Sequence, residues 1–179
     1  MQRMSSRLSN GLGWRREPPD FRDITFESHE VQGILRISNS YKAVSMPNAL
    51  LPASVDLRKW CTRVRNQDGL NSSTAFAVTA LMEYFERRAF GRHADFSELF
   101  LYRSTRDLLG YSADLGADLR STLRALQTFG LPAESLYPYE PERHAETPPP
   151  FCYGFADAFR TLRYFRLDDP KLGGQAVLL

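Results

Sequence analysis

Cysteine, histidine, net charge and long apolar runs are all scarce in this chain of 179 residues. Its two cysteines, Cys61 and Cys152, are too few for the disulfide framework of a small secreted domain. A formal net charge of +2 gives no reason to expect nucleic acid or an anionic membrane as a partner. No apolar run approaches a membrane span, and the first residues do not resemble a signal peptide. We therefore expect a reduced, cytoplasmic protein.

The three histidines do not form a recognisable site. His29 lies in a polar N-terminal stretch, His93 follows a helix stop, and His144 lies in a loop rich in Pro and Glu. No spacing of His, Cys, Asp and Glu resembles a metal-ligand set. We expect surface histidines, no metal and no cofactor.

What is present indicates a soluble globular protein. Hydrophobic residues make up 42% and charged residues 25% of the chain, enough for a real core. The length fits one domain, or one domain with an N-terminal extension. Alternation of apolar residues from Val31 to Ile37 predicts a strand. Residues 1–50 are open to two interpretations, a leader that covers a cleft or a flexible arm.

The securest predicted element is a helix that begins after Ser73 and ends at Gly91, a residue typical of helix C-caps. Apolar residues recur along it at helical spacing. They are Ala77, Ala80, Leu81, Tyr84 and Phe85, followed by Arg88.

Two further helices are predicted downstream. Ser97 is expected to cap one that runs to about Leu108 or Leu109, and 118–129 reads as the other, ended by Gly130. Residues 159–167 have an alternation compatible with a strand. Cys61 is expected to be a half-buried structural thiol.

One loop carries the clearest indication of chemistry. Gln67 stands six residues before Ser73, and Ala75-Phe76 follow. A thiolate at a helix N-terminus can attack a peptide carbonyl while its own N–H and a Gln amide hold the oxyanion. A serine hydroxyl is far harder to ionise, so most of that rate would be lost. The alternative interpretation is that Ser72 or Ser73 is only a helix N-cap.

This loop does not stand alone. The segments 51–58 (LPASVDLR), 96–99 (FSEL) and 137–139 (YPY) flank it in the order seen in papain-like cysteine peptidases, which the chain resembles. Leu70 and Thr74 are similar to a bacterial branch whose motif is Gly-Ser-Cys-Thr-Ala. The resemblance implies an α+β, papain-like fold, here mainly the helical N-terminal half with its long central helix and with the C-terminal β-rich domain truncated.

The resemblance also implies roles for single residues. Ser73 takes the nucleophile position and Gln67 the oxyanion hole, whereas Gly116 and Ala117 take the substrate-binding strand, where relatives have a second Gly. Gln175 falls at the position of the catalytic His. Asn71 replaces a usual Gly, which predicts a distorted oxyanion turn.

The same resemblance predicts three segments. Residues 1–50 would be a propeptide-like leader, 51–170 the helical half, and 171–179 a remnant or a tail. A central helix without its partner domain would expose apolar surface and allow self-association.

Three hypotheses follow. The chain could be an inactive pseudopeptidase that binds a peptide or protein in its residual cleft. It could be an active cysteine endopeptidase in a truncated form inactivated by Cys→Ser at 73. It could also be a helical interaction module unrelated to proteolysis, without the central helix and Gln-loop geometry.

Overall fold

The structure is a computed structural model that describes residues 13–18, 20–25, 27–37, 54–161 and 163–166. The chain divides into two compact units. The first comprises Met1–Glu17 and Leu57–Leu162, and the second Pro18–Asp56 and Arg163–Leu179. Each unit is described by itself.

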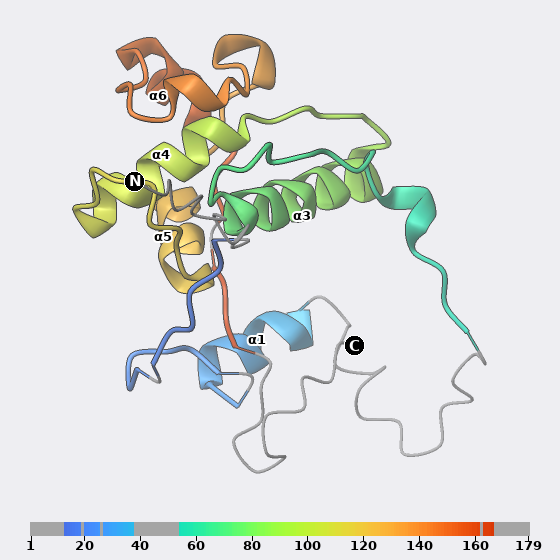
Figure 1. The fold of residues 1–179 in the computed structure, drawn as a ribbon. Coiled ribbons are helices and arrows are strands. Elements are labelled where there is room, and N and C mark those ends of the chain that lie inside the picture. Colours follow the sequence, from blue (N-terminus) through green and yellow to red (C-terminus); the bar gives the residue numbers. More distant parts are fainter. Residues whose placement is uncertain (1–12, 19, 26, 38–53, 162, 167–179) are drawn as a thin grey trace, which may run out of the picture. The chain divides into compact units, whose positions relative to one another are not determined.

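The long helix α3, Ser73–Phe90, is the central element of the first unit (Figure 1). Gly91 ends it in the left-handed conformation, at φ 67°, and donates its N–H to the Arg87 carbonyl, as predicted. One face of α3 is buried. Its members are Thr74, Ala75, Val78, Thr79 and Glu83.

The apolar stripe expected from the sequence lies on the other side of α3. Leu81 and Phe85 are 47% and 53% exposed, and Ala77 and Ala80 are exposed as well. The buried face of the helix therefore consists mostly of small and polar residues, while Leu81 and Phe85 face solvent in the described structure.

Helices α4, Glu98–Leu109, and α5, Leu119–Phe129, also have the predicted positions. Ser97 caps α4 by accepting a hydrogen bond from the Phe100 N–H at 3.1 Å. Asp118 caps α5 in the same way, accepting from the Ser121 N–H at 2.7 Å. Both helices thus begin at a residue that satisfies an otherwise unpaired backbone donor.

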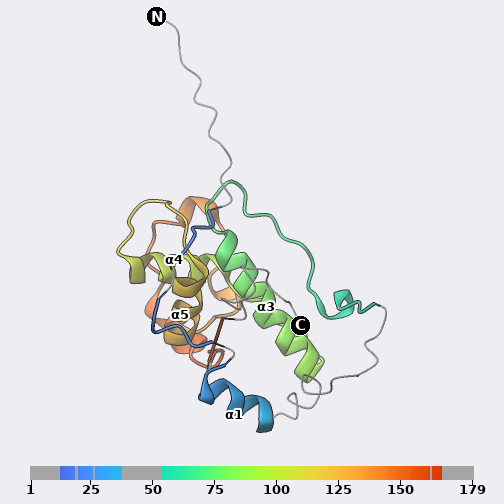
Figure 2. The same ribbon diagram turned by 90° about the horizontal axis from the view of Figure 1, so that it is seen from below.

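Helices α3, α4 and α5 pack against one another around a single core, as two perpendicular views show (Figures 1 and 2). The Thr122 hydroxyl on α5 donates to the Thr74 hydroxyl on α3 at 3.0 Å, so even the polar part of this contact is paired. The core comprises Leu70, Ala75, Val78, Phe96, Leu99, Phe100, Leu101, Tyr102, Ala125, Leu126, Leu131, Tyr137, Cys152 and Ala156.

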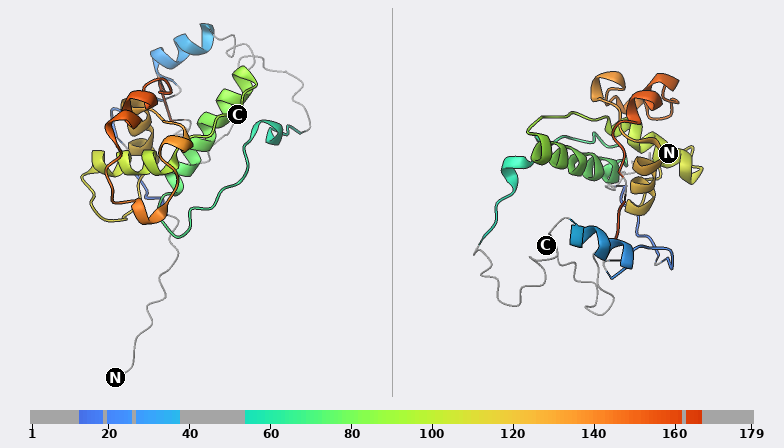
Figure 3. Two further views of the ribbon diagram at one scale, coloured as in Figure 1. Left: turned by 90° about the horizontal axis from the view of Figure 1, so that it is seen from above. Right: turned by 180° about the vertical axis from the view of Figure 1, so that it is seen from behind.

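The first unit also contains four short helical elements. They are the 3₁₀ turns η1 (Arg58–Trp60), η2 (Glu134–Leu136) and η3 (Pro141–Arg143), and the short helix α6 (Pro150–Ala156), visible from two further sides in Figure 3. Gly130 follows α5 at φ 76°, where a Cβ atom would lie 1.9 Å from the Ala156 carbonyl oxygen. Only glycine allows the backbone to pass α6 this closely.

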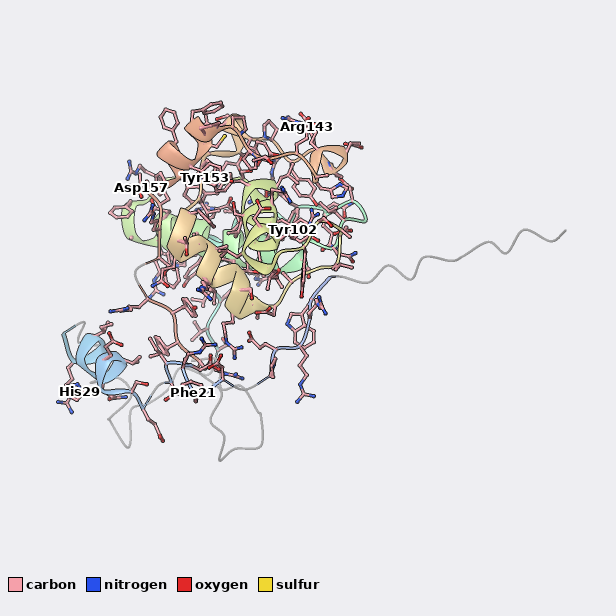
Figure 4. All side chains as sticks on the ribbon, turned by 90° about the vertical axis from the view of Figure 1, so that its left-hand side faces the viewer. Phe21, His29, Tyr102, Arg143, Tyr153 and Asp157 are labelled. Atoms are coloured by element: carbon pink, nitrogen blue, oxygen red, sulfur yellow. The ribbon has the colours of Figure 1, made fainter. Side chains whose placement is uncertain are left out.

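A buried guanidinium joins two loops to α4. Arg106 is fully buried, and its Nη1 donates to the His144 carbonyl at 2.9 Å while Nη2 donates to the Ser112 carbonyl. Its guanidinium carbon lies 5.3 Å from the ring centre of Tyr102, which Figure 4 shows among the side chains around α4. Backbone carbonyls and a ring face thus stabilise this charge.

The second unit contains helix α1, His29–Ile37, so the strand predicted for Val31–Ile37 is wrong. The residues Val31, Ile34 and Leu35 follow the i, i+3, i+4 spacing of a helix, and the run is too short for its alternation to decide. The Ser28 carbonyl accepts the first helical hydrogen bond, from the Gln32 N–H.

Two more expectations are corrected. The described part of 159–167 contains no strand, only an isolated parallel bridge between Thr25 and Arg166, in which the Arg166 N–H donates to the Ile24 carbonyl at 2.8 Å. Cys61 is exposed rather than half-buried, because it follows η1 in a segment that runs over the surface of α3. Within the described residues, no helix has the length and apolarity needed to cross a lipid bilayer.

Candidate active site

The loop before α3 is held in shape by its own polar groups. The Leu70 N–H donates to the Gln67 carbonyl at 3.1 Å, and the Gln67 side-chain amide donates to the Leu70 carbonyl at 2.7 Å. Asp68 has a positive φ of 48°, which the Asn66 side chain supports by accepting from the Asp68 N–H and donating to its carboxylate. The side chain of Asn66 thus supports a left-handed conformation at a residue other than glycine.

Two adjacent serines at the start of α3 have opposite environments. Ser72 is fully buried, and its hydroxyl lies 2.8 Å from the Tyr139 hydroxyl. Ser73 is the first residue of α3, and its buried Oγ has no hydrogen-bond partner among the described residues. Ser72 is the N-cap residue of α3, as one interpretation held, but its side chain makes no capping hydrogen bond, and Ser73 already belongs to the helix. Within the described part of the chain, no base contacts the hydroxyl at the predicted nucleophile position.

Tyr139 is a site residue that the sequence did not single out. Its hydroxyl donates to the Gln67 carbonyl at 2.9 Å as well as contacting Ser72, and its ring meets Phe76 edge-on at 4.9 Å. Burial raises the pKa of Tyr139 to about 12, so the hydroxyl remains a donor at neutral pH. The signal was available in the Tyr-Pro-Tyr motif, but only folding brings it to this loop.

Asn71, the residue that replaces a usual Gly, is bound by Asp114. The Asn71 N–H and side-chain amide both donate to the Asp114 carboxylate, at 3.1 and 3.0 Å. The Tyr102 hydroxyl donates to the same carboxylate and accepts from the Gly116 N–H at 3.2 Å. Burial, together with the adjacent Asp114, raises the pKa of Tyr102. This network joins the Gln67 loop to the predicted substrate strand.

The backbone of Ala117 is paired with the N-terminal segment 13–15. The Ala117 N–H donates to the Gly13 carbonyl at 3.0 Å, and the Arg15 N–H donates to the Ala117 carbonyl at 3.0 Å. These bonds form a parallel bridge between Trp14 and Ala117. We call the Ala117 backbone, with Gly116 beside it, the binding edge.

Glycines make the approach to this edge possible. A Cβ at Gly116, which has φ 73°, would lie 2.1 Å from the Gly13 carbonyl oxygen. A Cβ at Gly13 would lie 2.2 Å from the Asn71 carbonyl oxygen. The N-terminal segment, the binding edge and the Gln67 loop therefore meet backbone to backbone.

The remaining site predictions have different outcomes. Gln175 lies outside the described residues. The His144 ring Nδ1 lies 2.8 Å from the Pro141 carbonyl in its own loop, and His93 is exposed. In the described ranges, no three His, Cys, Asp or Glu side chains are grouped as they would be to hold a metal ion.

Solved structures with the same fold decide the architecture. Xylellain, a cysteine protease from Xylella fastidiosa, matches with a TM-score of 0.65 and 24% identity, over 87% of this chain and 58% of its own. Procathepsin L2 proteinase from the larval midgut of Tenebrio molitor matches with a TM-score of 0.62 and 22% identity, over 87% and 45%. The fold of this chain is papain-like.

A curated relative extends the papain-like assignment to sequence. An uncharacterized peptidase C1-like protein of Acanthamoeba polyphaga mimivirus is 26% identical over 176 residues, which cover 93% of this chain and 55% of the viral protein. Together, the sequence and fold comparisons support the papain-like cysteine peptidase family. No model of a known protein family matches the chain. The chain spans about half the length of these relatives.

The papain-like architecture confirms the predicted fold class, the helical half with its long central helix. The hypothesis of a module without this geometry is wrong, because α3 and the Gln67 loop before it are both present. The identities of the solved structures are low enough that they establish the fold and leave activity to be argued from the site.

Proposed function

We propose that this papain-like chain binds an extended peptide along the binding edge and does not hydrolyse it. The observation that supports binding is the pairing of Ala117, whose N–H and carbonyl both bond to an extended backbone at 3.0 Å. A backbone that offers a donor and an acceptor in line recognises a peptide largely independently of its sequence. Here the chain's own segment 13–15 occupies the edge, so another peptide must displace it.

The environment of Ser73 supports the absence of hydrolysis. A serine becomes a nucleophile only when a neighbouring base takes its proton. The Ser73 Oγ is buried and contacts no hydrogen-bonding group among the described residues. Loss of the activated nucleophile costs several powers of ten in rate, which leaves binding as the function of the site.

Substitution of one backbone donor tests the proposal. Arg15→Pro removes the N–H that bonds to the Ala117 carbonyl, whereas Arg16→Pro is a matched control at a residue whose N–H makes no backbone bond in the described structure. The probe is a fluorescent synthetic peptide with the sequence of residues 10–20. Arg15→Pro should bind this peptide at least several-fold more tightly than the unchanged chain or Arg16→Pro does.

Mass spectrometry of the bound peptide completes the test. An intact peptide after prolonged incubation agrees with binding without hydrolysis, and cleavage products would overturn it. Equal affinity of all three proteins for the peptide would mean that the binding edge is not the peptide site.

A second candidate is a cysteine endopeptidase for which Ser73 stands in place of Cys. The unpaired Oγ favours it, because a thiol bonds weakly and tolerates such a site better than a hydroxyl does. Ser73→Cys places a thiol at a helix N-terminus, which lowers its pKa. Iodoacetamide should then alkylate residue 73 at a lower pH than the exposed Cys61; similar pH dependence at both positions would reject a site built for a thiolate.

A further inference from the structure

The side chain of Glu17 lies at the start of helix α5, two residues beyond the segment 13–15 that pairs with the binding edge. Its Oε2 accepts a hydrogen bond from the Arg120 N–H at 3.0 Å, and the Arg120 Nε lies 3.9 Å from the same oxygen. A side chain 103 residues away in sequence thus already occupies this position. A peptide that replaced segment 13–15 in the same direction would bring its own side chain here.

A second carboxylate stands beside Glu17. Asp118, the N-cap residue of α5, accepts from the Ser121 N–H at 2.7 Å and from the Ser121 hydroxyl at 2.8 Å. The side chain of Glu17 is also hydrogen-bonded to that of Asp118. An ionised carboxylate only accepts hydrogen bonds, so two of them have no proton to share. Their contact requires a protonated carboxyl or a side chain that can donate.

The surroundings of Glu17 favour its neutral form. Its side chain is 22% exposed. Burial raises the pKa of Glu17 and the neighbouring Asp118 adds to this effect, while the N–H and the charge of Arg120 offset them only in part. At neutral pH the chain therefore places a charged group where the site better accommodates an uncharged one.

The two arginines that precede Glu17 have other surroundings. The Arg15 Nη1 donates to the Tyr111 hydroxyl at 3.0 Å, and the guanidinium carbon lies 5.4 Å from the ring centre of Tyr111. Arg16 is exposed. The contact of Arg15 with Tyr111, together with the backbone pairing at Ala117, fixes the register in which residue 17 reaches α5.

We propose that the binding edge selects peptides that carry glutamine at the position of Glu17, two residues beyond the one whose N–H pairs with the Ala117 carbonyl. A glutamine side chain has an acceptor for the Arg120 N–H and donors for the Asp118 carboxylate, so it satisfies both without taking up a proton. The inference rests on the proposed function, because it names a side chain of the peptide that binds there. The chain's own glutamate is then a weaker occupant than the peptide that displaces it.

Three peptides that differ at one position test the proposal. Each is acetylated and amidated and has the sequence of residues 10–20, with glutamate, glutamine or methionine at position 17. NMR titration of the full chain reports affinity and, through the Ala117 amide, the place of binding. All three peptides displace the same segment, so the ratio of their affinities depends on side chain 17 alone. At pH 7.5 the glutamine peptide should bind several-fold more tightly than either of the others.

The preference should depend on pH with a definite sign. A glutamate whose pKa is raised on binding contributes fully below its free value of 4.5, and the contribution is lost as pH rises through the raised value. The glutamate peptide should therefore approach the affinity of the glutamine peptide at pH 5. A ratio that does not change with pH would contradict contact between the bound carboxyl and Asp118.

Other outcomes separate this inference from the proposed function. Tighter binding of the glutamate peptide at pH 7.5 would mean an anion site at the start of α5, and equal binding of methionine and glutamine would mean an apolar contact only. Either result, with shifts at Ala117, would reject the selection and leave peptide binding intact. Absence of any shift at Ala117 would instead reject the proposed function.

Asp118→Asn provides a reciprocal test. Asparagine is as good an N-cap as aspartate, so α5 should form as before, and its amide donates to a carboxylate. The preference should therefore reverse in favour of the glutamate peptide. Asp157→Asn, at an exposed ion pair, is the matched control and should keep the preference for glutamine. An unchanged preference in Asp118→Asn would overturn the role of Asp118.

A test within the chain decides the inference even where no peptide binds. Glu17→Gln should increase the protection of the Ala117 amide from hydrogen exchange at pH 7.5, because glutamine holds the segment on the edge more firmly, and the gain should vanish at pH 5. Glu17→Met should protect less than Glu17→Gln does. Glu142→Gln, at an exposed carboxylate, is the control and should match the unchanged chain. Equal protection in Glu17→Gln and the unchanged chain at both pH values would overturn the inference.

Discussion

Asn71 and Asp114 join the Gln67 loop to the segment that carries the binding edge, through both the backbone and the side chain of Asn71. The carboxylate of Asp114 accepts from the Asn71 N–H at 3.1 Å and from its amide at 3.0 Å, and the Tyr102 hydroxyl donates to it as well. Asn71 stands where relatives have Gly, and its hydrogen bonds to Asp114 help to hold the loop before α3. The Gln67 loop and the binding edge therefore share one carboxylate, which lies 43 residues from Asn71 in sequence.

Asp114→Ala should lower the free energy of unfolding by about 2–3 kcal/mol, because three hydrogen-bond donors would lose their charged acceptor. Urea denaturation measures the change. Asp157→Ala is the control, since its ion pair with Arg160 is exposed and should be worth under about 1 kcal/mol. Equal losses in the two variants would show that the network contributes little.

The adjacent serines should respond to alanine in opposite directions. Ser73→Ala removes a buried hydroxyl that has no partner and should raise the free energy of unfolding by up to about 1 kcal/mol. Ser72→Ala removes the 2.8 Å contact with Tyr139 and should lower the same quantity by about 1 kcal/mol. Each variant controls for the other in one urea series. A loss of stability in Ser73→Ala would reveal a partner for Oγ.

Gly116→Ala should release the N-terminal segment from the binding edge, because the new Cβ would lie 2.1 Å from the Gly13 carbonyl oxygen. Hydrogen exchange at the Arg15 and Ala117 amides should accelerate. Gly110→Ala is the matched control, with a similar φ of 69° and open space around the Cβ position, so it carries the same backbone strain without the clash. Unchanged protection in Gly116→Ala would contradict the pairing.

Glu98 should make stability fall as pH rises. Its pKa is about 7 in the folded protein and near 4.5 when unfolded, so the folded state holds the proton more tightly. Its contribution is complete below pH 4.5 and is lost through pH 7, by up to about 3 kcal/mol at about 1.4 kcal/mol per unit. The loss arises because the carboxylate ionises in a buried position where Glu83 and Glu134 repel it, although Arg65 attracts it.

Glu98→Gln should flatten this pH dependence in urea denaturation between pH 5 and pH 8. The raised pKa of Glu134 acts in the same direction and is present in both proteins, so the difference between them isolates Glu98. Identical slopes for the two proteins would show that Glu98 does not titrate in this range.

Local signals predicted the helices well. The starts of α4 and α5 depend on Ser97 and Asp118, and the end of α3 on Gly91, and each of these residues acts within a few positions of itself. In α1, by contrast, the apolar residues among the seven from Val31 fit both the alternation of a strand and the spacing of a helix. So short a run does not distinguish the two.

Contacts between distant residues were beyond sequence reasoning. Ser72 was considered only as a cap, because nothing local indicates that Tyr139, 67 residues later, meets its hydroxyl. The stripe on α3 was found at the right spacing, but periodicity does not tell which face a neighbour covers. Sequence reasoning proposed Gln67, Ser73, Gly116 and Ala117 as site residues. The structure adds Tyr139, Asp114 and segment 13–15, which contact the Gln67 loop or the binding edge.

Arg106 makes two distant loops interdependent. The loop at Ser112 and the loop at His144 are far apart along the chain, yet both satisfy their carbonyls on one guanidinium. If either loop opened, the buried guanidinium would lose a hydrogen-bond acceptor, so the order of each loop depends on the other. Substitutions tolerated in one loop are then set by the geometry of the other, and the two would accumulate changes as a pair.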